Sequence, residues 1–240
     1  MSASALSRTS AGAHSELTPE RGSSPAVSLN FVMKCALSGS VESFTARIES
    51  EEQDREALVA MLVGRDADNK SPLDMAAILD RVEMVKELIA KGVDVNDATG
   101  TGHTALHYAA AWGKINTVKA LIENGANVHT KTTNTDERAR DVASRYEQLE
   151  CVDYLDWAEA KDKLQTEISV MRDIMADPEK SQGRLSREDK ALITSVCNEH
   201  ETWLQNTPEA TTSDFISHRN IVHEAFAPIN LKLSEPRMYE

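Results

Sequence analysis

The chain has 240 residues, of which 40% are hydrophobic, 27% are charged and 5% are aromatic, and its formal net charge is −13. These values are ordinary for a soluble globular protein of one or two domains. The negative charge argues against nucleic acid and anionic membranes as partners, and favours proteins with basic surfaces. The chain has three widely spaced cysteines and no CxxC pair, which is typical of a reducing compartment: Cys35, Cys151 and Cys197.

The N-terminal segment, residues 1–28, is rich in Ser, Ala, Thr and Gly and lacks apolar periodicity. We therefore predict a disordered tail. The segment contains no apolar run suited to a signal peptide, and no later run approaches membrane-spanning length. These observations predict a cytoplasmic protein and leave a cytoskeletal, midbody or ciliary location open.

Two segments, 68–100 and 101–133, share one skeleton, in which equivalent residues lie 33 positions apart. The matched pairs are Ser71 with Thr104, Leu73 with Leu106, Asp74 with His107, Leu88 with Leu121, and Gly92 with Gly125. A fixed period of this length is typical of stacked helical repeats, each a pair of helices joined by a turn. The adjacent alanines of each first helix provide a small face against which another helix can pack closely.

Several residues of this skeleton have predicted structural roles. Gly92 and Gly125 follow the apolar stripe of each second helix, where a left-handed turn commonly ends a helix. Thr104 and His107 are expected to hydrogen-bond the turn before the helix and to brace neighbouring repeats, and Leu106 is expected in the core.

The segments Thr104–Ala110 and Asn124–Val128 resemble the ankyrin repeat family, with Ala105 and Asp74 departing from its Thr-Pro-Leu-His pattern. The repeats are expected over residues 29–157. Within that range, residues 29–63 read as a degenerate first unit and residues 134–157 as a capping unit, as expected of the ends of a solenoid. The resemblance implies a stack of helices with one concave surface.

That concave surface is the expected binding site for another protein, because hairpin tips and first-helix faces lie along it. The residues expected to contact a partner are Asp68, Lys70, Thr101, His103, Tyr108, Trp112, Lys131 and Asn134. For Trp112, core packing between repeats is the alternative interpretation.

The C-terminal part, from residue 158 onward, is predicted to be a connecting amphipathic helix with a linker (158–183) and a helical hairpin (184–236). The helix either extends the capping unit or connects it to a separate module. The second hairpin helix is expected to end near Pro228. The hairpin resembles the helical lid of the seventy-kilodalton heat-shock chaperones in an ordered series of matches that includes Glu188–Lys190, Cys197–Glu199, Trp203–Leu204, Asp214–Phe215 and His218–Arg219. Trp203 is expected in the core of this hairpin.

The fold prediction is therefore all-α: a short ankyrin solenoid, a connecting helix and a C-terminal hairpin. The predicted function is a non-catalytic scaffold or adaptor for protein–protein interaction. A setting in cell division or proliferation is implied only by the resemblance of the whole chain to one member of the ankyrin repeat family. The alternative is a chaperone accessory protein that binds a heat-shock chaperone through the hairpin.

Catalytic and metal-binding functions find little support in the sequence. His103 and His107 are four residues apart, but His103 precedes the predicted helix, and a closed metal site needs three or four ligands. Cys197 lies near His200 inside an apolar helical pattern, where Cys usually acts as a small buried hydrophobe. We expect no enzyme activity, no cofactor and no metal.

Overall fold

The computed structural model describes residues 30–50, 55–177, 181 and 184–234. These residues form helices joined by turns, with two isolated β-bridges in the hairpins, which confirms the all-α prediction. The predicted tail, residues 1–28, lies outside the described residues. The helices are α1 (Phe31–Ser38), α2 (Val41–Ser50), α3 (Arg55–Val63), α4 (Pro72–Ile78), α5 (Val82–Ala90), α6 (Ala105–Ala111), α7 (Ile115–Glu123), α8 (Ala139–Arg145), α9 (Leu149–Ala176), α11 (Arg187–Asn206) and α12 (Thr212–Ser234).

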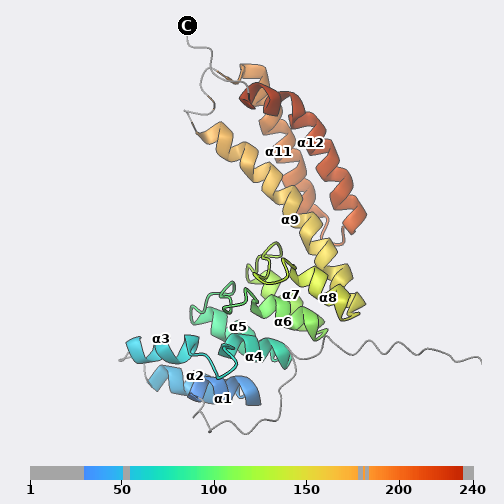
Figure 1. Cartoon of the computed structure of the whole chain (residues 1–240). Coiled ribbons are helices and arrows are strands. Elements are labelled where there is room, and N and C mark those ends of the chain that lie inside the picture. The colour runs from blue at the N-terminus through green and yellow to red at the C-terminus, as the bar shows by residue number, and fades with distance from the viewer. Residues whose placement is uncertain (1–29, 51–54, 178–180, 182–183, 235–240) are drawn as a thin grey trace, which may run out of the picture.

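The N-terminal two thirds form a stack of helix pairs (Figure 1). The inner helices α1, α4, α6 and α8 lie side by side, and α5, α7 and the start of α9 form the outer row. The helix α3 packs against α1 at the open end of the stack. Four helix pairs thus succeed one another in the described part of the chain, and the residues before the first pair lie outside the described residues.

Small and branched apolar side chains explain the close stacking. Ala76, Ala77, Ala109 and Ala110 are all 0% exposed, so inner helices meet with little between their backbones. Each outer helix contributes a buried leucine or isoleucine to the same core, namely Ile48, Leu88, Leu121 and Leu155.

Left-handed backbone recurs at three positions of the repeat. Each described hairpin has one such residue, namely Asn69, Gly102 and Asp136. Each turn from inner to outer helix also has one, and these are Gly39, Asp80, Gly113 and Glu147. The outer helices α5 and α7 end before Gly92 and Gly125, whose φ values are 91° and 88°. Only glycine adopts this conformation without a steric penalty.

The outer helix of the last repeat does not end at the position where Gly92 and Gly125 follow the earlier outer helices. Glu159 lies 34 residues after Gly125, in the position of the terminating glycine, and α9 runs through it to Ala176. The Glu159 side chain is largely buried and accepts hydrogen bonds or ion pairs from Arg138 and Lys163. Residues 149–157 and 158–176 form one helix, so the helix predicted from residue 158 extends the capping unit.

The extended part of α9 also replaces a hydrogen-bonded contact that earlier repeats make between successive loops. The Asn96 side chain accepts a hydrogen bond from the backbone N–H of Asn127 at 2.8 Å and donates one to the carbonyl of Gly125 at 3.2 Å. His129 lies 33 residues after Asn96, in the equivalent position. The loop that would face it in a further repeat is replaced by the continuing helix α9. The His129 ring instead contacts Asp162 of α9, with 2.9 Å between Nε2 and the carboxylate. The extended helix thus stands where the next repeat would begin.

The C-terminal helices α11 and α12 both pack against the extension of α9, and Figure 1 shows the three helices side by side. The predicted hairpin is therefore one part of a three-helix unit. Its core is apolar and consists of Leu164, Ile168, Met171, Leu185, Ile193, Cys197, Phe215, Val222, Phe226 and Ile229, together with Ala160 and Ala210. Trp203 is half-buried, stacks on His218 with ring centroids 3.7 Å apart, and meets Phe215 edge-on.

The helix α12 continues past Pro228 to Ser234, contrary to the predicted end. Proline removes one backbone hydrogen bond and disfavours a helix interior. Tertiary contacts beyond it hold the helix in place. Ile229 is 1% exposed, Lys232 pairs with Asp189 at 2.7 Å, and Arg184 donates to the carbonyl of Leu233 at 2.6 Å.

Candidate functional site

Three equivalent residues end the inner helices of the stack. Leu79, Trp112 and Tyr146 are the C-cap residues of α4, α6 and α8, and their backbone φ values lie between −92° and −95°. Leu79 is 38% exposed and Trp112 is 40% exposed, so the interpretation of Trp112 as a core residue is wrong. We call these three residues the cap row. Because adjacent inner helices pack together, the row crosses three successive repeats.

A groove opens between the first two members of the cap row. Its cavity volume is about 430 Å³, and its lining residues are Asp66, Asp68, Lys70, Met75, Ile78, Leu79, Trp112 and Lys114. The apolar members come from α4 and the end of α6. The charged members lie at two edges, one formed by the hairpin before α4 and the other by the turn before α7. An apolar base between charged edges is the usual form of a protein-binding surface.

Tyr108 lies beneath this surface rather than on it. The side chain is 5% exposed, and its ring stacks on His103 with centroids 5.6 Å apart. The Lys70 ammonium lies 6.0 Å from the centroid of the Tyr108 ring. Burial, together with the nearby Asp74 carboxylate, raises the pKa of Tyr108 to about 12. The prediction that Tyr108 contacts a partner is therefore wrong, because the ring is enclosed by its neighbours.

Three of the predicted contact residues line the groove, and the others do not. Asp68, Lys70 and Trp112 line the groove. The remaining four belong to later hairpins and line no part of it; they are Thr101, His103, Lys131 and Asn134. Their role in binding stays a prediction.

The hairpins are fixed by side chains at equivalent positions. Asp74 accepts a hydrogen bond from the N–H of Ser71 at 2.8 Å, which closes a capping box at the start of α4. In the next repeat His107 Nδ1 accepts from the N–H of Thr104 at 3.2 Å. The other His107 nitrogen lies 3.2 Å from the carbonyl of Glu137 in the following hairpin. Successive hairpins are thus tied to one another.

Arg65 forms the corresponding tie between the hairpins before α4 and α6. Its guanidinium donates to the carboxylate of Asp97 at 2.8 Å and to the carbonyl of Ala98 at 3.0 Å. It also donates to the carbonyl of Asn69 at 2.8 Å. These bonds join two hairpins and hold the acidic edge of the groove in one place.

The buried Asp74 carboxylate predicts a pH dependence. Burial raises its pKa to about 6, partly offset by the hydrogen bonds from Ser71. The folded state therefore holds this proton more tightly than the unfolded chain, so Asp74 adds stability as the pH falls from about 6 to about 4. Relative to Asp74→Asn, the parent should gain about 2–3 kcal/mol of unfolding free energy between pH 7 and pH 4. Urea titrations of both proteins across this range would measure the difference.

Asp141 provides the control for that experiment, because it occupies the same position of α8. Burial acts to raise its pKa, but hydrogen bonds from Arg138 outweigh burial and lower it. Asp141→Asn should therefore shift the pH profile in the opposite direction. If both substitutions changed stability equally at every pH, the assignment for Asp74 would fail.

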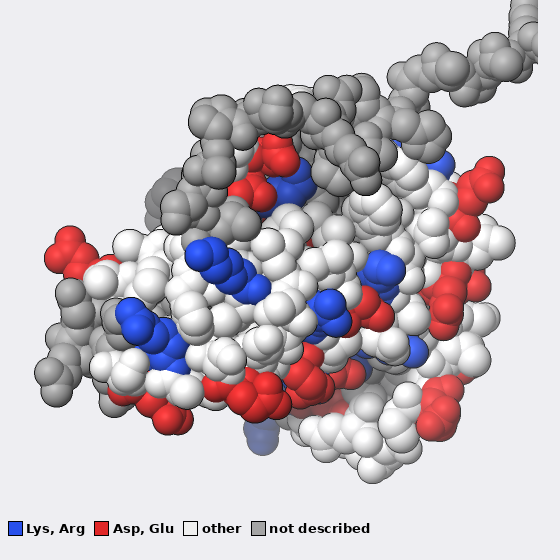
Figure 2. Space-filling view, turned by 90° about the horizontal axis from the view of Figure 1, so that it is seen from below, with Lys and Arg blue, Asp and Glu red and all other residues white. Residues whose placement is uncertain are grey.

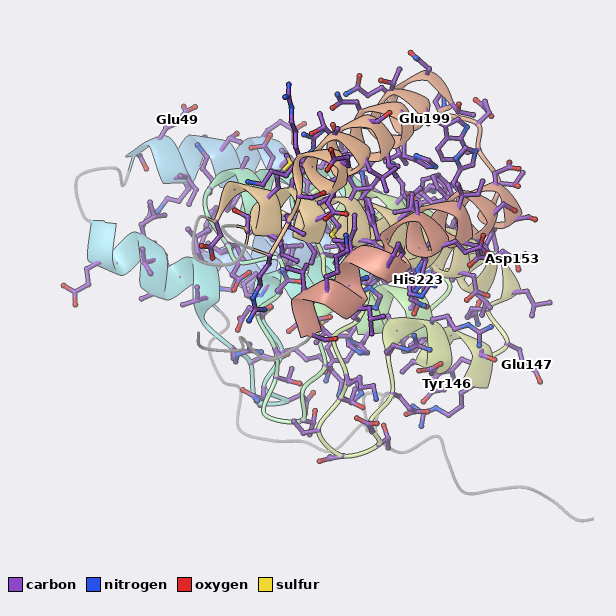
Figure 3. The ribbon with its side chains drawn as sticks, turned by 90° about the horizontal axis from the view of Figure 1, so that it is seen from above. Glu49, Tyr146, Glu147, Asp153, Glu199 and His223 are labelled. Atoms are coloured by element: carbon purple, nitrogen blue, oxygen red, sulfur yellow. The ribbon has the colours of Figure 1, made fainter. Side chains whose placement is uncertain are left out.

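Sequence reasoning missed two members of the cap row and one close backbone approach. Leu79 and Tyr146 stand at the same repeat position as Trp112, so the repeat period alone would have found them. Figure 3 shows Tyr146 beside Glu147 in the turn that ends α8. A Cβ added to Gly102 would lie 2.7 Å from the backbone nitrogen of Thr133, a contact that only the stacked hairpins reveal.

Other chemistry finds no matching site in the described part of the chain. Among these residues no group of three or more His, Cys, Asp and Glu side chains is placed to hold a metal ion. Burial raises the pKa of all three thiols, that of Cys151 to about 11, which disfavours a nucleophilic thiolate. No described helix has the length and hydropathy needed to cross a membrane. On the face shown in Figure 2, acidic and basic side chains are interspersed with uncharged surface.

Comparison with known proteins places the repeats in a family. The model of ankyrin repeats (three copies) matches residues 32–132 and 97–167. Ankyrin repeat domain-containing protein 45 of Homo sapiens is 35% identical over 208 residues, which cover 86% of this chain and 78% of that protein. The Mus musculus protein of the same name is 36% identical, with 88% and 85% covered. The Danio rerio protein is 42% identical over 57% of this chain, and the match spans 60% of its length. By its matched repeats and its stacked helix pairs, the chain belongs to the ankyrin repeat family.

Proposed function

We propose that this protein is a non-catalytic adaptor that binds another protein through the groove and the cap row. The observation that carries the proposal is the exposure of Trp112, which is 40% exposed and lines the groove. Large aromatic side chains that lie half-exposed between polar edges commonly dominate binding free energy at interfaces. The ankyrin stack supports this proposal because its repeats present one continuous surface to a partner.

Trp112→Ala should abolish most partner binding while helical content stays unchanged. Tyr108→Ala is an unsuitable companion because the Tyr108 ring is buried, so its loss would also disturb packing. Leu79→Ala is the better companion because Leu79 lines the same groove. Affinity capture from cells with the full chain, followed by measurement of the affinity of each recovered partner, would test the expectation.

Leu149→Ala is the matched control for this experiment. Leu149 is 71% exposed and lies at the start of α9, outside the groove. Partners that bind the groove should be retained by Leu149→Ala and lost by Trp112→Ala. Equal capture by both variants would show that the concave face is not the binding site.

The chaperone alternative makes a different prediction for the same experiment. The helices α11 and α12 bury one side against α9, which leaves their outward sides, including the 55% exposed Ile221, for a chaperone. A chaperone that is retained by Trp112→Ala and lost by Ile221→Glu would favour this alternative. If Ile221→Glu still retained the chaperone, the outward side of α11 and α12 would be excluded as its binding site.

A further inference from the structure

The cap row has a spacing that selects the shape of its ligand. Trp112 follows Leu79 by 33 residues, and Tyr146 follows Trp112 by 34. The three residues therefore repeat once for each inner helix. Packed helices lie about 9 Å apart, so a ligand that uses the whole row must present matching side chains at about this interval.

A segment in the polyproline II conformation meets this condition. It has three residues per turn and rises about 3.1 Å per residue, so every third side chain lies on one side at intervals of about 9 Å. A β-strand places same-side residues about 7 Å apart, and its third residue points the opposite way. The strand therefore falls out of register by the second contact.

A helical ligand is disfavoured by its spacing. An α-helix rises about 1.5 Å per residue, so its same-side residues three or four positions apart are separated by about 5–6 Å. This step is shorter than the interval of about 9 Å between cap residues, and a step of seven residues, about 10.5 Å, is longer than it.

The hairpin edge of the groove carries two acidic residues and one lysine, and the other edge carries Lys114 alone. On the hairpin edge the Asp68 side chain is 68% exposed, and Lys70 Nζ lies 3.9 Å from its carboxylate. On the other edge Lys114 follows the turn after Trp112 and lines the groove. In a three-residue turn the two side chains that do not face the cap row point to these two edges. Charge complementarity therefore favours a basic residue toward Asp68 and an acidic residue toward Lys114.

We propose that the partner segment is a polyproline II stretch with an apolar residue or proline at every third position. Between these residues it carries one basic and one acidic side chain. The inference rests on the proposed function, since it assigns the ligand of the same groove. Aromatic-lined surfaces suit such segments because the conformation is preformed and loses little entropy on binding.

The test is selection of a phage-displayed library of random short peptides on the full chain. Enriched peptides should show apolar residues at a period of three. Trp112→Ala and Tyr146→Ala should each weaken the binding of selected peptides about thirtyfold, as expected for aromatic anchors, whereas Leu149→Ala should leave it unchanged. Lys114→Glu should weaken binding, and an acidic-to-basic exchange in the peptide should restore it.

The outcomes separate this inference from the proposed function. Peptides that need Trp112 but show a period of two or seven, or that are indifferent to Tyr146→Ala, would overturn the polyproline II assignment and leave the groove as the binding site. If no selected peptide is weakened by Trp112→Ala, the polyproline II assignment is overturned, and loss of the cellular partners in that variant would then decide separately whether the groove binds proteins. Circular dichroism and thermal unfolding of each variant would show that the helices are retained.

Discussion

Gly102→Ala should lower the free energy of unfolding by about 3 kcal/mol, whereas Gly125→Ala should lower it by only about 1 kcal/mol. Both glycines have a left-handed backbone, with φ values of 79° and 88°, so both substitutions carry the conformational penalty. Only Gly102 adds a clash. Its new Cβ would lie 2.7 Å from Thr133 N and 3.1 Å from Thr132 Cα, and these backbone atoms cannot rotate away.

Urea unfolding monitored by circular dichroism would measure both values. Around Gly125 a new Cβ would meet nothing within 4 Å, which makes this substitution the control for backbone strain alone. Equal losses in the two variants would mean that the hairpins do not approach as closely as the structure shows. A larger loss for Gly102→Ala would establish the hairpin-to-hairpin packing, together with the bond from the N–H of Thr133 to the carbonyl of Thr101.

Trp157→Ala should lower the free energy of unfolding by about 3 kcal/mol and should divide one unfolding transition into two. Trp157 packs against both hydrophobic cores, that of the stack and that of the three-helix unit. Its indole N–H donates to the carbonyl of Ala210 at 2.8 Å, and its ring meets Phe215 edge-on. Removal of this side chain leaves the helix α9 as the main remaining connection between the two units.

Trp157→Phe separates packing from hydrogen bonding. A phenyl ring retains much of the apolar contact and loses the bond to Ala210, so a loss of about 1 kcal/mol and a single transition are expected. Differential scanning calorimetry would distinguish one transition from two. A single transition in Trp157→Ala, with an unchanged ratio of calorimetric to van't Hoff enthalpy, would contradict the proposed coupling.

The repeats were predictable because each repeat meets the same physical environment. Stacked units bury equivalent side chains, so Leu88 and Leu121, or Gly92 and Gly125, recur at one period in the sequence. The exposure of the first-helix residues was not predictable in this way. Tyr108 and Trp112 lie one helical turn apart, and whether each is enclosed depends on neighbours such as Lys70 that come from another hairpin.

The C-terminal part was harder to predict because tertiary contacts override local signals there. Proline commonly ends a helix, but contacts of Ile229 and Lys232 hold α12 together beyond Pro228. The continuation of α9 past residue 158 has a related cause. Glu159 stands where the earlier repeats have a glycine that ends the outer helix, but this replacement alone only weakly predicts a longer helix. The helix continues because Arg138 and Lys163 stabilise the Glu159 carboxylate within it.

The uninterrupted α9 has a mechanical consequence. Its 28 residues span about 42 Å, and they contain no proline or glycine at which the helix would bend. A force applied to α11 or α12 would therefore reach the last repeat as rotation of a stiff lever, with His129 and Arg138 near its pivot. If one protein bound the repeats and a second bound the C-terminal helices, the rigid helix α9 would keep the two at a fixed distance from each other.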